Sequence, residues 1–150
     1  KAEMQVKAMF AEEPLLRSIL AQDPALAQMV QRTRGMPAAA THFERIRIGE
    51  AIAGAVQVRR AADEDALTRA LAPFALANVL SPPHHERGVL NAAFLVDRSE
   101  LSRFDERVEA LSEEHAPEIE FKLIGPLPAY SFANDDRDVS GSKEVGVEWA

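Results

Sequence analysis

The stretch VLNAAFLVD, residues 89–97, decides the fold class. Up to Val96 its residues are apolar on both sides of an extended chain, apart from Asn91. A strand with one face in water alternates apolar and polar residues, whereas a strand covered on both faces reads as a continuous apolar run. The stretch therefore predicts a central strand of a sheet.

Three other segments predict strands. Residues 4–10 (MQVKAMF) and 118–124 (EIEFKLI) alternate with the period of two that a half-buried strand has. In the second of them, Ile119, Phe121 and Leu123 are expected to face inward. The shorter FALANVLS, residues 74–81, follows a proline and predicts a short strand.

Two short helices are predicted directly after the first strand, over residues 12–22 and 23–33. Each has a proline placed for its first turn, and Asp23 is the expected N-cap of the second. Thr41 is expected to cap a long helix that runs to about Leu71. The packing face of this helix is predicted to contain Ile48, Ile52, Ala55, Val56, Ala62, Ala66 and Ala70.

The other side of the long helix is charged, and we interpret it as a face turned to solvent. It carries Arg59, Arg60, Asp63, Glu64 and Asp65. Ser99 is the expected N-cap of a last helix, because apolar residues at near-heptad spacing follow it. These residues are Leu101, Phe104, Val108 and Leu111.

The predicted order is strand, helices, strand, strand, helix, strand. This is the ferredoxin-like βαββαβ plan, an α+β fold with the first and third strands in the middle of an antiparallel sheet and helices on one face. The helical pair after the first strand is an addition to it. We expect residues 1–133 to form this domain, as the C-terminal domain of a longer protein, and residues 134–150 to form a polar, acidic tail. Alternation of Val145, Val147 and Trp149 predicts that the tail docks on this domain or on a neighbour.

The composition excludes several classes of function. The formal net charge of the 150 residues is −7, which argues against binding to nucleic acid or to anionic membranes. No apolar run approaches the ~20 residues that span a bilayer, so membrane insertion is not expected. The chain has no cysteine, which removes disulfides, thiolate metal ligands and a cysteine nucleophile and fits a cytoplasmic protein.

His84, His85 and Glu86 form the best candidate for metal binding or acid–base chemistry. Adjacent histidines in a strand-like connector point to opposite sides, however, so they are poor ligands for one ion. We interpret the segment as a surface loop whose Glu86 and Arg87 make local hydrogen bonds. Nucleophile motifs and phosphate-binding glycine motifs are absent from the sequence. We therefore predict no catalytic residue, metal or cofactor, and no enzyme.

The segment IGPLPAYSFAN, residues 124–134, contains the only tyrosine of the chain. Its two prolines are expected to prevent sheet pairing and to keep the segment extended, with both aromatic residues on one side. Rigidly held aromatic side chains act either as a latch on the domain's own core or as anchors for a partner. The candidate interface contains Arg87, Pro126, Leu127, Pro128, Tyr130 and Phe132.

Two sequence signatures resemble the gas vesicle protein GvpL/GvpF family. They are PPHHERGVLNAAFLVDRSE, residues 82–100, and FKLIGPLPAYSFAN, residues 121–134. MQVKAMF and GEAIAGAV also look like the corresponding parts of that family. The closing motif of the family is nearer to GPWPPYSF, from which Leu127 and Ala129 depart.

The resemblance implies a non-enzymatic accessory protein of gas vesicle formation. Its implied partners are the gas vesicle shell protein and other accessory proteins, and its implied location is the gas vesicle, with a cytoplasmic stage before assembly. The main rival interpretation is an ACT-like module that binds a small molecule. That module predicts a glycine-rich turn after the first strand, where this chain has AEEPLL.

Overall fold

The computed structural model describes residues 1–133, so the prediction that Val145, Val147 and Trp149 dock lies outside the described residues. Four strands form one antiparallel sheet in the order β2-β3-β1-β4. They are β1 (Ala2–Phe10), β2 (Ala77–Leu80), β3 (Gly88–Val96) and β4 (Ile119–Leu127). The predicted α+β class is confirmed, and the first and third strands lie in the middle of the sheet as expected.

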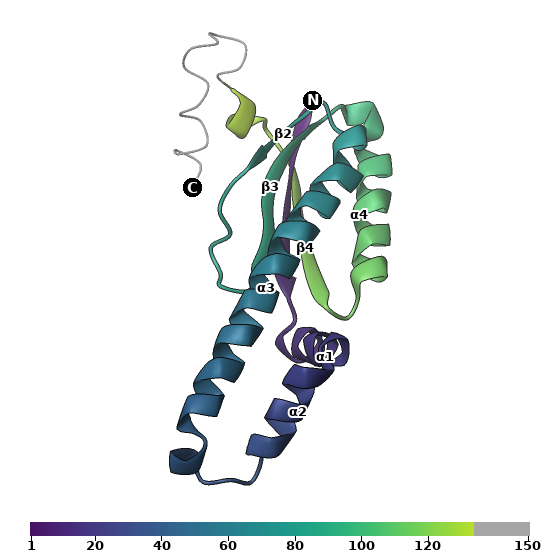
Figure 1. Ribbon diagram of the computed structural model, residues 1–150. Coiled ribbons are helices and arrows are strands. Elements are labelled where there is room, and N and C mark those ends of the chain that lie inside the picture. Colours follow the sequence, from purple (N-terminus) through teal and green to yellow (C-terminus); the bar gives the residue numbers. More distant parts are fainter. Residues whose placement is uncertain (134–150) are drawn as a thin grey trace.

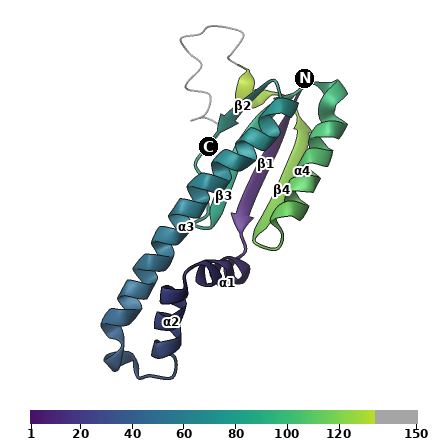
Figure 2. The same ribbon diagram turned by 45° about the vertical axis from the view of Figure 1, so that its right-hand side comes forward.

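Within residues 1–133, four α-helices accompany the sheet. They are α1 (Glu12–Gln22), α2 (Pro24–Thr33), α3 (His42–Leu71) and α4 (Leu101–His115). Helices α3 and α4 lie on the same side of the sheet, which agrees with the predicted single helical layer (Figures 1 and 2). The first half of α3 extends past the sheet and lies beside α2, so that the two helices project as a hairpin (Figure 1).

The core lies between the sheet and this helical layer. Met4, Val6 and Ala8 of β1 stand directly opposite Phe94, Ala92 and Leu90 of β3, so these six side chains share one face of the sheet. From the helices, the core receives Leu67, Leu71, Phe104, Val108 and Leu111, all of them buried. The rings of Phe94 and Phe104 meet with centroids 5.3 Å apart and planes tilted by 53°.

The packing face predicted for α3 is only partly right. The half-buried residues Ile48, Ile52, Ala55, Val56 and Ala70 pack on the core as expected. Ala62 and Ala66 are exposed instead, and Leu67 and Leu71 are fully buried. An α-helix turns about 100° per residue, so four residues turn 40° beyond a full revolution. A line of residues chosen four positions apart therefore drifts around the helix and leaves its buried side.

The charged side of α3 was wrongly predicted to be only a solvent-facing surface. The Arg59 guanidinium donates to Ser18 Oγ at 2.6 Å and to Glu118 Oε2 at 2.9 Å. The Arg60 guanidinium donates to the carbonyl oxygens of Gly88, at 2.8 Å, and Glu86. These two arginines therefore tie α3 to α1, to the start of β4 and to the β2–β3 connection.

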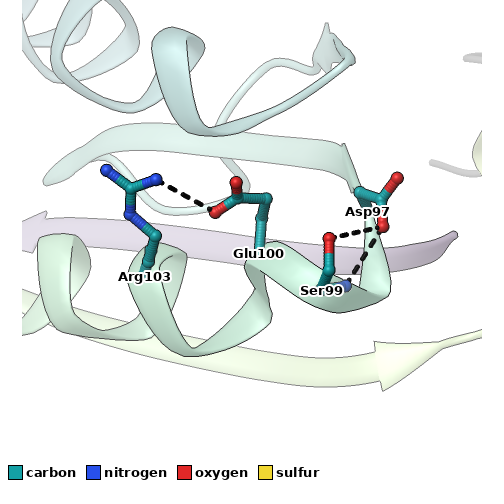
Figure 3. Close-up of polar contacts among 4 residues, drawn as sticks. All are labelled: Asp97, Ser99, Glu100 and Arg103. Carbon is teal, nitrogen blue, oxygen red and sulfur yellow. Dashed lines mark hydrogen bonds and ion pairs between the residues drawn. The ribbon is translucent and has the colours of Figure 1, made fainter.

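Of the three residues predicted as helix N-caps, only Asp23 accepts a hydrogen bond from an N–H of its helix through its side chain. Asp23 caps α2 as expected, since its Oδ1 accepts from the Leu26 N–H at 3.1 Å. Ser99 is not the N-cap of α4, because Asp97 begins a 3₁₀ turn over Arg98–Glu100 and accepts hydrogen bonds from both the N–H and the hydroxyl of Ser99 (Figure 3). The Thr41 hydroxyl donates to Pro37 O and accepts from Arg45 Nε rather than from a helix N–H.

Candidate interaction surface

The proline-containing segment begins as part of the sheet. Leu127 pairs with Glu3 and Ile124 with Gln5, so the expectation that the prolines prevent pairing is wrong for this stretch. One extra residue of β4 lies between these two pairs, which makes a β-bulge. Gly125 occupies it with φ at +132°, and a Cβ atom there would lie 2.7 Å from Glu3 O. Only glycine fits this backbone position without strain.

Beyond β4, Tyr130–Phe132 forms a 3₁₀ turn, labelled η4. Residues two apart in a turn of three residues point in different directions, so the expectation that both aromatic side chains share one side is wrong. Tyr130 is 72% exposed, whereas Phe132 is 5% exposed. The Phe132 side chain is therefore buried on the domain, as expected for a latch, whereas the Tyr130 side chain is exposed.

A buried carboxylate holds η4 against the first strand. Glu3 of β1 is 1% exposed, and its Oε1 accepts from the Ser131 N–H at 2.9 Å. Its Oε2 accepts from the Ser131 hydroxyl at 3.0 Å and from Gln5 Nε2 at 2.9 Å. Sequence reasoning missed Glu3 and Ser131, which are 128 positions apart, because no local pattern connects them.

The structure brings together only some of the predicted interface residues. Pro126, Pro128 and Tyr130 are exposed, and Leu127 is half-buried between them in the sequence. We call these four residues the proline–tyrosine surface. Arg87 is elsewhere: it donates to Phe10 O at the far end of β1, about 20 Å from Glu3 at the rise of an extended strand.

The β2–β3 connection, with its two histidines, is a surface loop with close local contacts, in which His84, His85 and Glu86 are exposed. A Cβ atom on Gly88 would lie 2.3 Å from Pro83 Cβ, and His85 Nδ1 accepts from the Arg87 N–H at 3.0 Å. The hollow beside this loop, about 270 Å³ in volume, is lined by His85 and Glu86 but does not include Arg87. Within residues 1–133, no three histidine or acidic side chains are gathered as a metal site would require.

A polar hollow of about 330 Å³ lies where α1, α3 and α4 meet. Its lining includes Ser18, Arg59, Asp63, His115 and Glu118. Burial raises the pKa of the Asp63 carboxyl above its usual value of 3.8, while the charges of His115 and Arg59 pull it down and that of Glu118 pushes it up. Of these side chains, Arg59 and Glu118 form an ion pair at 2.9 Å, and Asp63 and His115 lie close enough to influence each other electrostatically.

Replacing Asp63 by asparagine is expected to change how stability depends on pH. Because the pKa is raised on folding, the folded protein keeps a proton that the unfolded chain has lost, and stability falls as pH rises from 3.8 to the folded pKa. Asparagine does not titrate, so the Asp63→Asn variant lacks this loss. The free energy of unfolding of the variant minus that of the unmodified chain should therefore rise between pH 3.8 and the folded pKa of Asp63, and stay constant at higher pH. Urea unfolding of both proteins at a series of pH values measures the difference. A difference that does not vary with pH would contradict the assignment.

Another hollow, of about 390 Å³, lies near the start of α4. Phe74, Leu76, Asp97, Glu100 and Arg103 line it, and the Arg103 guanidinium lies 6.0 Å from the Phe74 ring centroid. Arg103 also approaches Glu100 at 3.5 Å (Figure 3). Hydrogen bonds from the N–H and hydroxyl of Ser99 lower the pKa of Asp97. Arg103 and Glu100 are thus engaged with each other at an exposed site.

None of the helices in the described part of the chain is both apolar enough and long enough to span a membrane. The fold and the surface together define an α+β domain whose distinctive feature is a proline–tyrosine segment fastened to its first strand. The chain belongs to the gas vesicle synthesis protein GvpL/GvpF family, whose model matches residues 1–134.

Individual relatives agree with this assignment. The chain is 32% identical over 132 residues to gas vesicle protein F of Streptomyces sp. (strain CB03234), a match that covers 88% of this chain and 54% of that protein. It is 27% identical over 136 residues to gas vesicle protein F of Dolichospermum flosaquae, covering 91% of this chain and 55% of the relative. The chain thus spans about half the length of these relatives.

Solved structures share the fold. The crystal structure of the gas vesicle protein GvpF from Anabaena sp. PCC7120 superposes with a TM-score of 0.71 at 23% identity, over 88% of this chain and 53% of that one. GvpF from Microcystis aeruginosa gives a TM-score of 0.62 at 22% identity, over 88% of this chain and 54% of that one.

Proposed function

We propose that this chain is a non-catalytic accessory factor of gas vesicle assembly that binds the gas vesicle shell protein and other accessory proteins. Family membership supports a gas vesicle-related accessory role. We also propose that the chain is the C-terminal domain of a longer protein, and that it works at the gas vesicle after a cytoplasmic stage.

The observation that carries the proposal is the exposed, rigidly held proline–tyrosine surface. Its tyrosine is 72% exposed, although the neighbouring Ser131 and Phe132 are buried and hydrogen bonds from Ser131 fasten the turn to Glu3. Prolines and an anchored turn leave little conformational freedom to lose on binding, so more of the contact energy appears as affinity. Tyrosine is also among the residues that most often dominate interface energetics.

A physical role for such contacts follows from the chemistry of an apolar shell subunit. Apolar surface that will face gas in the finished shell drives aggregation while it still faces water. An acidic partner can cover that surface, at a gain of about 25 cal/mol per Å² of apolar area hidden, and release it to the growing shell. The net charge of −7 suits a partner that must keep the complex in solution.

Replacing Tyr130 by alanine should weaken binding to the shell protein while leaving the fold intact. Because the side chain is exposed, the unfolding free energy should change by less than about 0.5 kcal/mol. Loss of an anchoring tyrosine should raise the dissociation constant at least about fivefold. Pull-down and titration with the purified shell protein measure the effect.

The matched control is Val58→Ala, because Val58 is 71% exposed on α3, away from the proline–tyrosine surface. It should bind as the unmodified chain does. Equal affinity of the Tyr130→Ala variant and this control would remove the surface from the proposed interface.

A further inference from the structure

The tip of the projecting α2–α3 hairpin combines features that the proposed function does not use. We define the hairpin tip by its apolar residues Met36, Phe43 and Ile46 and its basic residues Arg32, Arg34, Arg45 and Arg47. It lies beyond the end of the sheet, far from the proline–tyrosine surface (Figures 1 and 2).

The apolar residues of the tip are exposed. Phe43 is 76% exposed, Ile46 is 47% exposed and Met36 is 46% exposed. Phe43 and Ile46 are three positions apart on α3, so their side chains are neighbours on the helix surface. Single exposed apolar residues are ordinary, but an almost fully exposed phenylalanine with two apolar neighbours at one end of the molecule is typical of a contact site.

The charge of the tip is opposite to that of the whole chain. Between positions 32 and 47 there are four arginines and only one acidic residue, Glu44, although the chain has a net charge of −7. All four guanidinium groups belong to exposed residues. Among residues 1–133, the recorded ion pairs of arginine involve positions 59, 69, 103 and 107, none of them in the tip.

The connection that carries the tip is held in one conformation by hydrogen bonds. Thr33 and Thr41 are buried, and their hydroxyl groups donate to the carbonyl oxygens of Val30 and Pro37. Arg45 Nε donates to Thr41 Oγ1 at 2.7 Å, which orients the remaining guanidinium N–H groups of Arg45 outward from this contact. These contacts order the backbone of the connection, so binding has little backbone entropy left to lose there.

We propose that the hairpin tip binds an acidic helical segment of a partner protein, with Phe43 in an apolar recess and the arginines on carboxylates. Guanidinium groups pair with carboxylates through two parallel hydrogen bonds, which fits the presence of arginine rather than lysine at all four positions. A narrow acidic segment can contact the tip alone. An extended anionic surface would also approach the acidic remainder of the chain and be repelled by it, so the narrow segment is the favoured partner. This binding is independent of the proline–tyrosine surface.

Fluorescence anisotropy of a labelled amphipathic peptide tests the proposal with the full chain. The probe carries leucine on one face and glutamate on the other, and two control peptides replace glutamate by glutamine or leucine by serine. The chain should bind the probe, bind both control peptides at least about tenfold more weakly, and lose affinity as salt is raised.

Tip variants should lose this binding without unfolding. Arg34→Gln/Arg47→Gln and Phe43→Ser should each raise the dissociation constant of the probe about tenfold, and the double variant should depend less on salt. Arg98→Gln and Val58→Ser, at exposed positions outside the tip, are the matched controls. All of these residues are exposed, and melting curves followed by circular dichroism should show unchanged stability.

Three results would overturn the proposal. The tip variants could bind the probe like the unmodified chain, or the glutamine peptide could bind as well as the glutamate peptide. Vesicles of phosphatidylserine could also bind the chain through the tip in preference to the peptide, which would assign the tip to a membrane surface instead.

Discussion

Replacing Glu3 by alanine is expected to lower the free energy of unfolding by about 2–4 kcal/mol. The Glu3 carboxylate is 1% exposed and accepts three hydrogen bonds, two of them from Ser131. Alanine would leave the N–H and hydroxyl of Ser131 buried without their acceptors, and a buried donor without a partner costs its full desolvation energy. The variant should also loosen η4, because Glu3 is the group that holds it to β1.

Urea unfolding gives the stability change, and hydrogen exchange of the Ser131 amide reports on η4. The matched control is Glu120→Ala, which removes an exposed carboxylate from β4 of the same sheet and should change stability by less than about 0.5 kcal/mol. Ser131→Ala should give a smaller loss than Glu3→Ala, since it removes one hydrogen bond and keeps the N–H contact. Native stability of Glu3→Ala with a protected Ser131 amide would contradict the assigned role.

Replacing Gly125 by alanine is expected to cost about 3 kcal/mol, from a strained backbone together with a steric clash. Its φ of +132° lies where residues with a Cβ atom rarely occur. The new Cβ would lie 2.7 Å from Glu3 O and 2.9 Å from Met4 Sδ. The first of these atoms belongs to the backbone of a central strand, so it cannot move away cheaply.

Gly54→Ala provides a control in which the free energy of unfolding is expected to change in the opposite direction. Gly54 lies inside α3, where a Cβ atom would meet nothing within 4 Å. Alanine in a helix interior is more stable than glycine by roughly 0.5–1 kcal/mol. Thermal or urea unfolding of the two variants should therefore move in opposite directions, and a stable Gly125→Ala variant would show that the bulge tolerates a side chain.

Much of the fold could be predicted because its strands and helix ends have local signals. The apolar run of β3, interrupted only by Asn91, indicated its central position, and Asp23 indicated the start of α2 through its capping side chain. The buried face of α3 was harder to predict, because α3 packs on the sheet along one part and on α2 along another. The burial of Leu67 and Leu71 in place of Ala62 and Ala66 depends on that tertiary arrangement.

The candidate surface was predictable in composition but not in shape. The sequence indicated an unusual segment at residues 124–134. The exposure of Tyr130 and the burial of Phe132, however, depend on the 3₁₀ turn. That turn is fastened by Glu3, which lies at the other end of the sequence. The tip of the α2–α3 hairpin was not singled out either, because its residues come together only where two helices and their connection meet.

The position of β1 has a consequence for synthesis on the ribosome. Of the four strands described, β1 is made first, but its neighbours in the sheet are β3 (Gly88–Val96) and β4 (Ile119–Leu127). At a translation rate of about 5–20 residues per second, an apolar segment waits on the order of ten seconds for its second neighbour to be made. During that interval the nascent chain depends on chaperones, or on the charged helices already made, to keep this segment from pairing with another polypeptide.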